Sequence, residues 1–205
     1  MAINSFHIDE KPSVRYDKDG CKGNFTKLSP MPTQTRPFKN FLAAKDMRVY
    51  HGSDVLVEIP RIMQPIRALD FGTGFYTTTN EEQAKSFAKK VQDRNGSAES
   101  HISIYTVNIE LLKKQKSLFF EKPNKKWLDF VSANRNGTYN GEIYDVIYGP
   151  VANDTIFKTF IAYQNGTLSE QETLRRLKIR PLFNQLVLTN EEALKCLSFA
   201  GELKK

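Results

Sequence analysis

Three short stretches of the chain carry side chains whose types could take part in chemistry. Tyr50–Ser53 places His51 at the end of a predicted strand, beside a glycine that exposes backbone groups. Tyr76 follows a Gly-x-Gly turn, and Gln185 lies at the start of the apolar stretch NQLVL. Backbone groups beside a glycine can recognise an amide, and an aromatic face can stack on a flat cationic ring. Taken singly, His51 also fits a structural histidine and Tyr76 a core residue.

The turn before Tyr76 lies in the stretch DFGTGFYTTTN, residues 70–80, which contains patterns of two other protein classes. A protein kinase needs a glycine-rich loop, a lysine-bearing strand and a His-Arg-Asp loop before its Asp-Phe-Gly. Only 69 residues precede Asp70, and the chain has no His-Arg-Asp. A dinucleotide-binding loop needs a third glycine, and a P-loop needs Gly-Lys-Ser/Thr. The stretch is therefore predicted to be a turn that opens into a strand and presents Tyr76.

The elements that must position these residues predict an α+β fold with a mixed, mostly antiparallel sheet. Strands are expected over 48–52, 74–79, 101–110, 117–121, 142–150, 184–189 and 197–203. Helices are expected over 79–96, 124–135, 151–166, 168–178 and 189–197. Strands and helices intermix without regular βαβ alternation, and no internal repeat is present.

Local signals refine the expected helices. Capping boxes are expected where Thr79, Ser169 and Thr189 each precede a glutamate by three residues. Two helix faces are predicted to pack inward, one made of Ala84, Phe87, Ala88 and Val91, the other of Trp127, Phe130 and Val131. The strand over 101–110 is expected to extend its alternation to Ile109.

The bulk properties place limits on the class of protein. The chain has 205 residues, which fits a polar N-terminal extension or linker over 1–45 followed by one domain over 46–205. Its start has no signal-peptide pattern, and no run reaches transmembrane length, so no membrane role is expected. Two cysteines form neither a disulfide framework nor zinc spacing, and no metal is expected. A cytoplasmic setting is the simplest inference, with secretion without a cleaved signal as the alternative.

The net charge of +7 would suit nucleic acid, an acidic protein surface or a phosphate-rich small molecule. It equally fits a protein with lysines on its solvated faces. The basic residues are scattered, which argues against a dedicated nucleic-acid groove.

The order of the motifs resembles the ADP-ribosyltransferase superfamily, in its poly(ADP-ribose)-polymerase-like branch with a His-Tyr-Glu signature. The resemblance covers residues 48–199. The chain also resembles a bacterial domain-of-unknown-function family built around YHGS, DFGxGFY and GPVANDT. The resemblance to the superfamily implies a split mixed sheet with flanking helices, and NAD as substrate.

The resemblance also implies a role for each matching residue. His51 would contact the adenine-side ribose of NAD, and the backbone of Gly52 would hold the nicotinamide carboxamide. Tyr76 would pack on the nicotinamide ring, Phe87 would sandwich it, and Gln185 would take the place of the catalytic glutamate. Ser53 and Gly74 complete the residues that would contact NAD. Residues 177–183 would help to shape the acceptor site.

Gln185 departs from the family pattern because an amide cannot offer a negative charge to an oxocarbenium-like transition state. The resemblance therefore implies transfer of single units or no activity. Asp154 or Glu142 could supply the missing acid, although capping a helix explains Asp154 and solvation explains Glu142. Asn134 and Arg135, at a predicted helix end, could meet a phosphate or the acceptor, or simply be solvated.

These observations favour an NAD-dependent mono-ADP-ribosyltransferase that modifies a macromolecule, with a protein as the first choice. Relatives of this kind are often toxins or effectors, and an antitoxin or inhibitor protein would then be a partner. A catalytically inactive module that binds NAD or ADP-ribose, an NAD glycohydrolase and a nucleic-acid binder are the alternatives.

Overall fold

A seven-stranded mixed sheet forms the centre of the computed structural model, which describes residues 47–65, 67–151, 154–178 and 183–203. The strands are β1 (Met47–Ser53), β2 (Phe75–Thr78), β3 (His101–Val107), β4 (Ser117–Phe119), β5 (Val146–Pro150), β6 (Asn184–Leu188) and β7 (Leu197–Glu202). Their order across the sheet is β4-β5-β6-β2-β1-β3-β7, and only β4 and β5 are parallel. The predicted α+β class with a mostly antiparallel sheet is confirmed. Residues 1–45 lie outside the described residues, so the extension stays a prediction.

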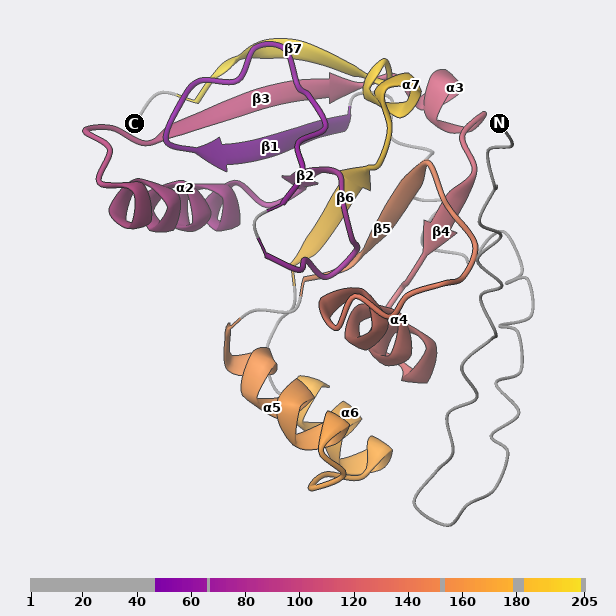
Figure 1. Ribbon diagram of the computed structural model, residues 1–205. Helices are drawn as coiled ribbons and strands as arrows, with labels where there is room; N and C mark the ends of the chain where they lie inside the picture. The colour runs from indigo at the N-terminus through magenta and orange to yellow at the C-terminus, as the bar shows by residue number, and fades with distance from the viewer. Residues whose placement is uncertain (1–46, 66, 152–153, 179–182, 204–205) are drawn as a thin grey trace, which may run out of the picture. The chain divides into compact units, whose positions relative to one another are not determined.

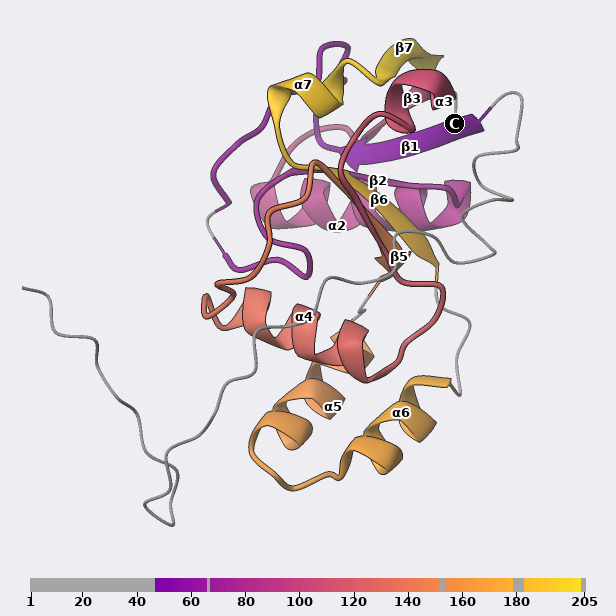
Figure 2. The same ribbon diagram turned by 90° about the vertical axis from the view of Figure 1, so that its right-hand side faces the viewer.

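The helices lie in the connections between the strands, as labelled in Figure 1. They are α2 (Glu81–Asn95), α3 (Ile109–Leu112), α4 (Lys125–Arg135), α5 (Asp154–Gln164), α6 (Glu170–Lys178) and α7 (Glu191–Leu194). Figure 2 shows α2 and α4 on one side of the sheet, with α7 on the other. The helices α5 and α6 pack on each other and connect β5 to β6. Within the described part of the chain, no helix has the length and apolarity needed to cross a bilayer.

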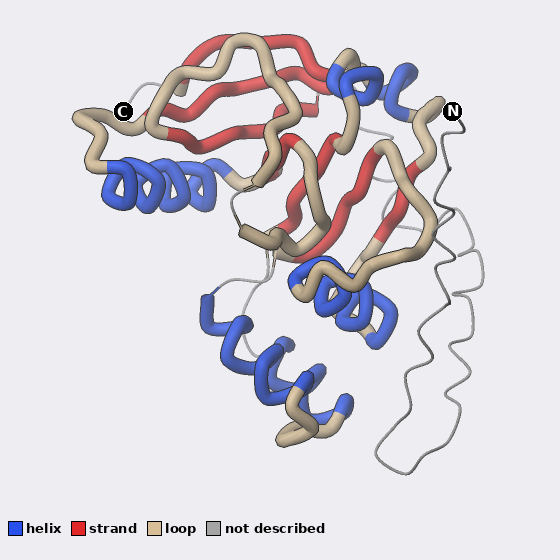
Figure 3. Tube along the Cα trace, in the orientation of Figure 1, coloured by secondary structure: helices blue, strands red, loops and turns tan. Residues whose placement is uncertain are grey.

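The sheet consists of two parts that meet at a single residue pair. β1 pairs with β3 along its whole length, from Met47 to Ser53. β2 pairs with β6 along all of its residues. Between β1 and β2, by contrast, only Tyr50 and Thr78 are paired among the described residues. The strands β7, β3 and β1 therefore form one part and β2, β6, β5 and β4 the other, as the tube in Figure 3 shows.

The larger core lies on the face of the sheet that α7 covers. Val49, Phe75 and Tyr105 from three neighbouring strands are buried there. The loop around Val57 lies on the same face, since the hydroxyl of Tyr105 donates to the carbonyl of Val57. The central sheet and the inward residues Trp127, Phe130 and Val131 of α4 agree with the predicted pattern.

On the opposite face of the sheet, α2 lies very close to β1. A Cβ atom on Gly52 would lie 2.3 Å from the carbonyl oxygen of Ala84 and 2.8 Å from the amide nitrogen of Ala88. Only glycine on the strand, with alanines on the helix, allows this approach. Phe87 was predicted to pack inward and does not, because it is 45% exposed. It lies about 60° around the helix from the centre of the Ala84, Ala88 and Val91 stripe.

Several element boundaries differ from the predicted ones. Asn80 and Asn190, rather than Thr79 and Thr189, cap α2 and α7, because each asparagine directly precedes the first helical residue with extended backbone angles. The predicted cap of Ser169 on α6 is confirmed by its 3.2 Å bond from the Glu172 amide. Ile109 begins the short helix α3 instead of extending β3. Residues 142–145 precede β5 as a loop.

Candidate functional site

His51 spans the division between the two parts of the sheet. Its Nδ1 atom lies 2.8 Å from the carbonyl oxygen of Tyr76 on β2. A carbonyl only accepts, so Nδ1 carries the proton and donates. The ring stacks on Phe75 with centroids 4.4 Å apart. Burial lowers the pKa of His51, so the ring is neutral at pH 7. Its Nε2 lone pair then has no hydrogen-bond donor among the described residues.

Tyr76 closes the turn that precedes it. Its hydroxyl accepts from the Phe71 amide at 3.0 Å and donates to the Gly72 carbonyl at 2.7 Å. Burial is the main cause that raises the pKa of Tyr76, so the hydroxyl keeps its proton. Gly72 has a φ of 77°, a left-handed conformation that glycine adopts without strain. The predicted Gly-x-Gly turn is therefore stabilised by two hydrogen bonds of the Tyr76 hydroxyl.

Gln185 is buried near the same division, with 6% of its surface exposed. It pairs with Thr78 on β2 and with Gly149 on β5. Its Nε2 atom is buried and has no hydrogen-bond partner within the described structure. A buried unpaired donor costs about 1–3 kcal/mol, and such a group calls for an explanation in a ligand, an ion or water.

His51, Tyr76 and Gln185, which were predicted from the sequence to form one site, do not all lie on the same face of the sheet. Partners in antiparallel register share a face, and neighbours along a strand alternate. Tyr50, Thr78 and Gln185 form one row, and Tyr76 lies on their face, the one that α2 covers. His51 belongs to the opposite face. The structure brings His51 and Tyr76 into contact through the backbone of β2, and it aligns Gln185 with the pair that joins β1 to β2.

The other residues expected around NAD lie on β1, on the turn and on α2. Ser53 donates to Asp54 at 3.3 Å. Gly74 lies against β6, where a Cβ atom would be 2.6 Å from Cγ1 of Val187. Phe87 has an exposed ring on the side of the sheet that carries Tyr76. With 45% of its surface exposed, Phe87 is partly open to solvent or a ligand.

Asn134 and Arg135 are not solvated helix ends. Arg135 pairs with Asp70, with Nη2 at 2.5 Å and Nε at 2.6 Å from the same carboxylate oxygen. Asn134 donates to the carbonyl of Phe130 at 2.9 Å, and its Oδ1 is 2.8 Å from where a Cβ of Gly72 would be. Both residues therefore face the turn at the start of the DFGTGFY stretch. A motif alone does not reveal this pairing, because 65 residues separate Asp70 from Arg135.

Of the two acids that could have compensated for Gln185, the structure describes the side chain of Glu142 only, and Glu142 is not near Gln185. Glu142 pairs with Lys116 at 2.8 Å and accepts from Tyr144, and these two bonds lower the pKa of its carboxyl. It precedes β5, whereas Gln185 is opposite Gly149 near the other end of that strand. Asp154 is the first residue of α5, and its side chain lies outside the described part of the chain. Most of the segment 177–183 lies outside it as well.

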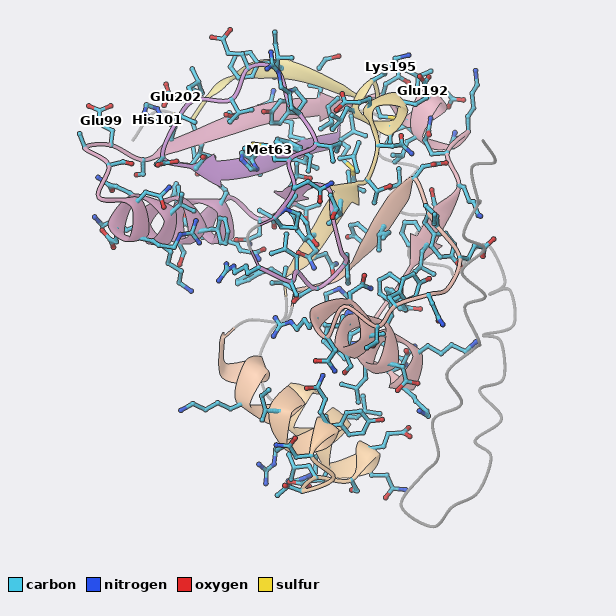
Figure 4. All side chains as sticks on the ribbon, viewed as in Figure 1. Met63, Glu99, His101, Glu192, Lys195 and Glu202 are labelled. Carbon is cyan, nitrogen blue, oxygen red and sulfur yellow. The ribbon has the colours of Figure 1, made fainter. Side chains whose placement is uncertain are left out.

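Two further polar clusters lie away from the division. Asp54 accepts from Ser97 at 2.7 Å and Asn95 at 2.9 Å, bonds that lower its pKa to about 2. His101 on β3 lies between Glu202 at 2.7 Å and Glu99 at 3.7 Å, as Figure 4 shows. No group of three or more acidic, histidine or cysteine side chains in the described residues could hold a metal ion.

The chain belongs to a family described as proteins of unknown function (DUF3990), whose model matches residues 47–199. No curated protein matches the sequence, and no solved structure matches the fold. Membership in a family of unknown function, one of the two expected resemblances, is thereby confirmed. The resemblance to ADP-ribosyltransferases is not supported by these comparisons, so the NAD-dependent activity stays a prediction.

Proposed function

We propose that the chain binds NAD where β1 and β2 part and transfers single ADP-ribose units to a macromolecule. The observation that carries the proposal is the division itself. A sheet interrupted between two inner strands, with His51 bonded across the gap and a buried, unpartnered Gln185 amide beside it, has polar groups that a ligand would complete.

The neutral state of His51 supports a contact with a sugar hydroxyl. Its Nδ1 proton is committed to the Tyr76 carbonyl, which leaves Nε2 as an acceptor for a ribose hydroxyl. On β1, the residues after Tyr50 have no partner in β2. The backbone edge at Gly52 is therefore a suitable partner for the nicotinamide carboxamide.

Aromatic side chains on the α2 side of the sheet suit the nicotinamide ring. Tyr76 is held by its hydroxyl, and Phe87 offers an exposed ring. In the proposed reaction the bond between C1′ of the ribose and the nicotinamide nitrogen breaks, and nicotinamide leaves with the bonding pair. An acceptor atom then bonds to C1′ and releases its proton to solvent.

The amide of Gln185 makes the proposed reaction slow and limited to single units. Its oxygen can accept from a ribose hydroxyl, and its Nε2 donor gains a partner when a ligand arrives. It supplies no negative charge for the developing oxocarbenium ion, so less transition-state stabilisation is available. A protein is the proposed acceptor, and a role as a toxin or effector held by an antitoxin or inhibitor protein stays a family-level prediction.

The test is nicotinamide release from labelled NAD by the purified protein, with and without cell lysate. We expect release with lysate and label on a macromolecule, and no release by folded His51→Ala or Tyr76→Ala. Release without lysate, giving free ADP-ribose, would indicate a glycohydrolase. Full activity in either folded variant would remove the site assignment.

A second candidate is an inactive module that binds NAD or ADP-ribose. The observation that favours it is that no carboxylate among the described residues accepts a hydrogen bond from the Nε2 atom of Gln185. Gln185→Glu separates the two candidates. A transferase should release nicotinamide faster with the carboxylate, most clearly at higher pH, because burial raises the pKa of a carboxyl. An inactive module should bind NAD before and after the change and release nothing.

A further inference from the structure

We infer that Arg135 is a positioning residue for the nicotinamide half of the site, acting through Asp70 and the turn that holds Tyr76. The inference rests on the proposed function. It concerns residues that are outside the His-Tyr-[Glu/Gln] signature, because Asp70 and Arg135 belong to a turn and a helix end that the signature does not include.

The ion pair is the first link. Arg135 is the last residue of α4, and two of its nitrogens lie 2.5 and 2.6 Å from one oxygen of Asp70. The two side chains are only 18% and 9% exposed. A charged pair shielded from water is stronger and more directional than the exposed pairs elsewhere in the chain. Lys125 and Asp129, for example, form an exposed pair four residues apart on α4.

The turn is the second link. Phe71 and Gly72, which follow Asp70, bond the Tyr76 hydroxyl from both sides. The ring of Phe71 lies 6.0 Å from that of Phe120 and 5.9 Å from that of Phe130 on α4, measured between centroids. β2 determines where the backbone of Tyr76 lies, and the turn determines where its hydroxyl lies. Arg135 therefore helps to set the direction of the Tyr76 ring.

The third link is the position of Gln185 relative to this assembly. Gly149, its partner on β5, faces the Phe71 ring, because a Cβ on Gly149 would be 3.2 Å from Cζ of Phe71. The turn therefore lies over the strands beside the unpartnered Nε2 atom. Loosening the turn would disturb Tyr76 and the surroundings of Gln185 together, which are the groups proposed for the nicotinamide end.

His51 contacts the backbone carbonyl of Tyr76, which β2 positions, and makes none of the side-chain contacts of the turn. Its ring stacks on Phe75 on the opposite face of the sheet and bonds the backbone of β2. A contact of His51 with the adenine-side ribose should therefore survive the loss of the ion pair. The inference predicts a split effect, in which nicotinamide binding weakens and ADP-ribose binding does not.

The experiment titrates nicotinamide and ADP-ribose separately into wild-type protein, Arg135→Met, Asp70→Asn and the double variant, with NMR detection. We expect each single change to weaken nicotinamide binding about tenfold while ADP-ribose binding stays within about twofold. The double variant should bind nicotinamide no more weakly than either single variant, since each single change already breaks the Arg135–Asp70 ion pair. Lys125→Met, which breaks the exposed pair on the same helix, should change neither affinity.

The outcomes separate the inference from the proposed function. If wild-type protein binds neither ligand, the proposed function fails. If it binds both and Arg135→Met weakens both equally or neither, Arg135 is only structural and the inference is overturned. Should Arg135→Met not fold, Arg135→Lys and Tyr76→Phe apply the same test, and each should weaken nicotinamide binding while ADP-ribose binding stays within about twofold.

Discussion

The two edges that face each other across the division of the sheet are held in different ways. On one side, β1 is paired with β3 along its full length and pressed against α2 through Gly52. On the other side, β2 has only four residues, and a turn tied to the end of α4 reinforces it through Asp70 and Tyr76. One edge is held by backbone pairing over seven residues, and the other by pairing with β6 over four residues together with these side-chain contacts.

The difference indicates which edge can respond to a ligand. Paired backbone groups in a long strand open only with large parts of the sheet. A four-residue strand paired with β6, whose preceding turn is held by one hydroxyl and one ion pair, depends on fewer bonds. Variants on the two sides should accordingly differ in kind, with global loss of stability on the β1 side and local loosening on the β2 side.

Gly52→Ala should have the largest effect on stability. The added Cβ would meet the backbone of α2, which cannot move as a flexible side chain could. We expect the free energy of unfolding to fall by about 3 kcal/mol, the upper end of the usual range for overpacking. Denaturant unfolding measures this, with Ser53→Ala as the control. A loss below about 0.5 kcal/mol would mean that α2 does not lie so close.

Tyr76→Phe should have a smaller, local effect. It leaves the Phe71 amide and the Gly72 carbonyl without their partner, which should cost about 1–3 kcal/mol. Hydrogen exchange at the Phe71 amide should speed up while amides of β1 stay protected. Tyr144→Phe, which removes a hydroxyl bound to the exposed Glu142, is the matched control. Equal loss of protection on both edges would contradict the comparison.

His51 should make the bridge between the two edges sensitive to acid. Its pKa in the folded state is below the ordinary 6.5, so the unfolded chain binds the proton first as pH falls. Stability should therefore drop below about pH 6.5, by at most about 1.4 kcal/mol per pH unit. His51→Asn should remove this slope. An unchanged slope in His51→Asn would assign it to other groups.

The smallest expected effect is at the end of β1, where Asp54 joins the chain after α2. Ser97 is the first of the bonds that hold the pKa of Asp54 at about 2. Ser97→Ala should move that pKa up toward 3.8, and the stability that Asp54 contributes would then be lost at a higher pH during acidification. An NMR titration of the carboxyl measures the shift. An unchanged pKa would mean that the bond from Asn95 is sufficient to keep the pKa of Asp54 low.

Much of the fold followed from local pattern. Alternation predicted the central strands, the Gly-x-Gly turn before Tyr76 was expected, and so were the inward faces of α4. The wrong predictions concern a helix cap that either of two neighbouring residues could form and the packing of one aromatic side chain. Thr79 and Asn80 can both cap a helix, and only backbone angles choose between them. Phe87 is apolar, yet α2 approaches Gly52 too closely for a phenyl ring to lie between them.

The sequence by itself determined which residue types are available: a histidine beside a glycine, a tyrosine after a turn, and a glutamine where the resembled family has an acid. These are chemical identities, and no folding can change them. Only the tertiary structure decided that His51 bonds the backbone of Tyr76 from the opposite face and that Arg135 pairs with Asp70. It also decided that Glu142 precedes β5, at the end of that strand away from Gln185. Such pairings depend on strand register and on contacts between distant segments, which local pattern does not encode.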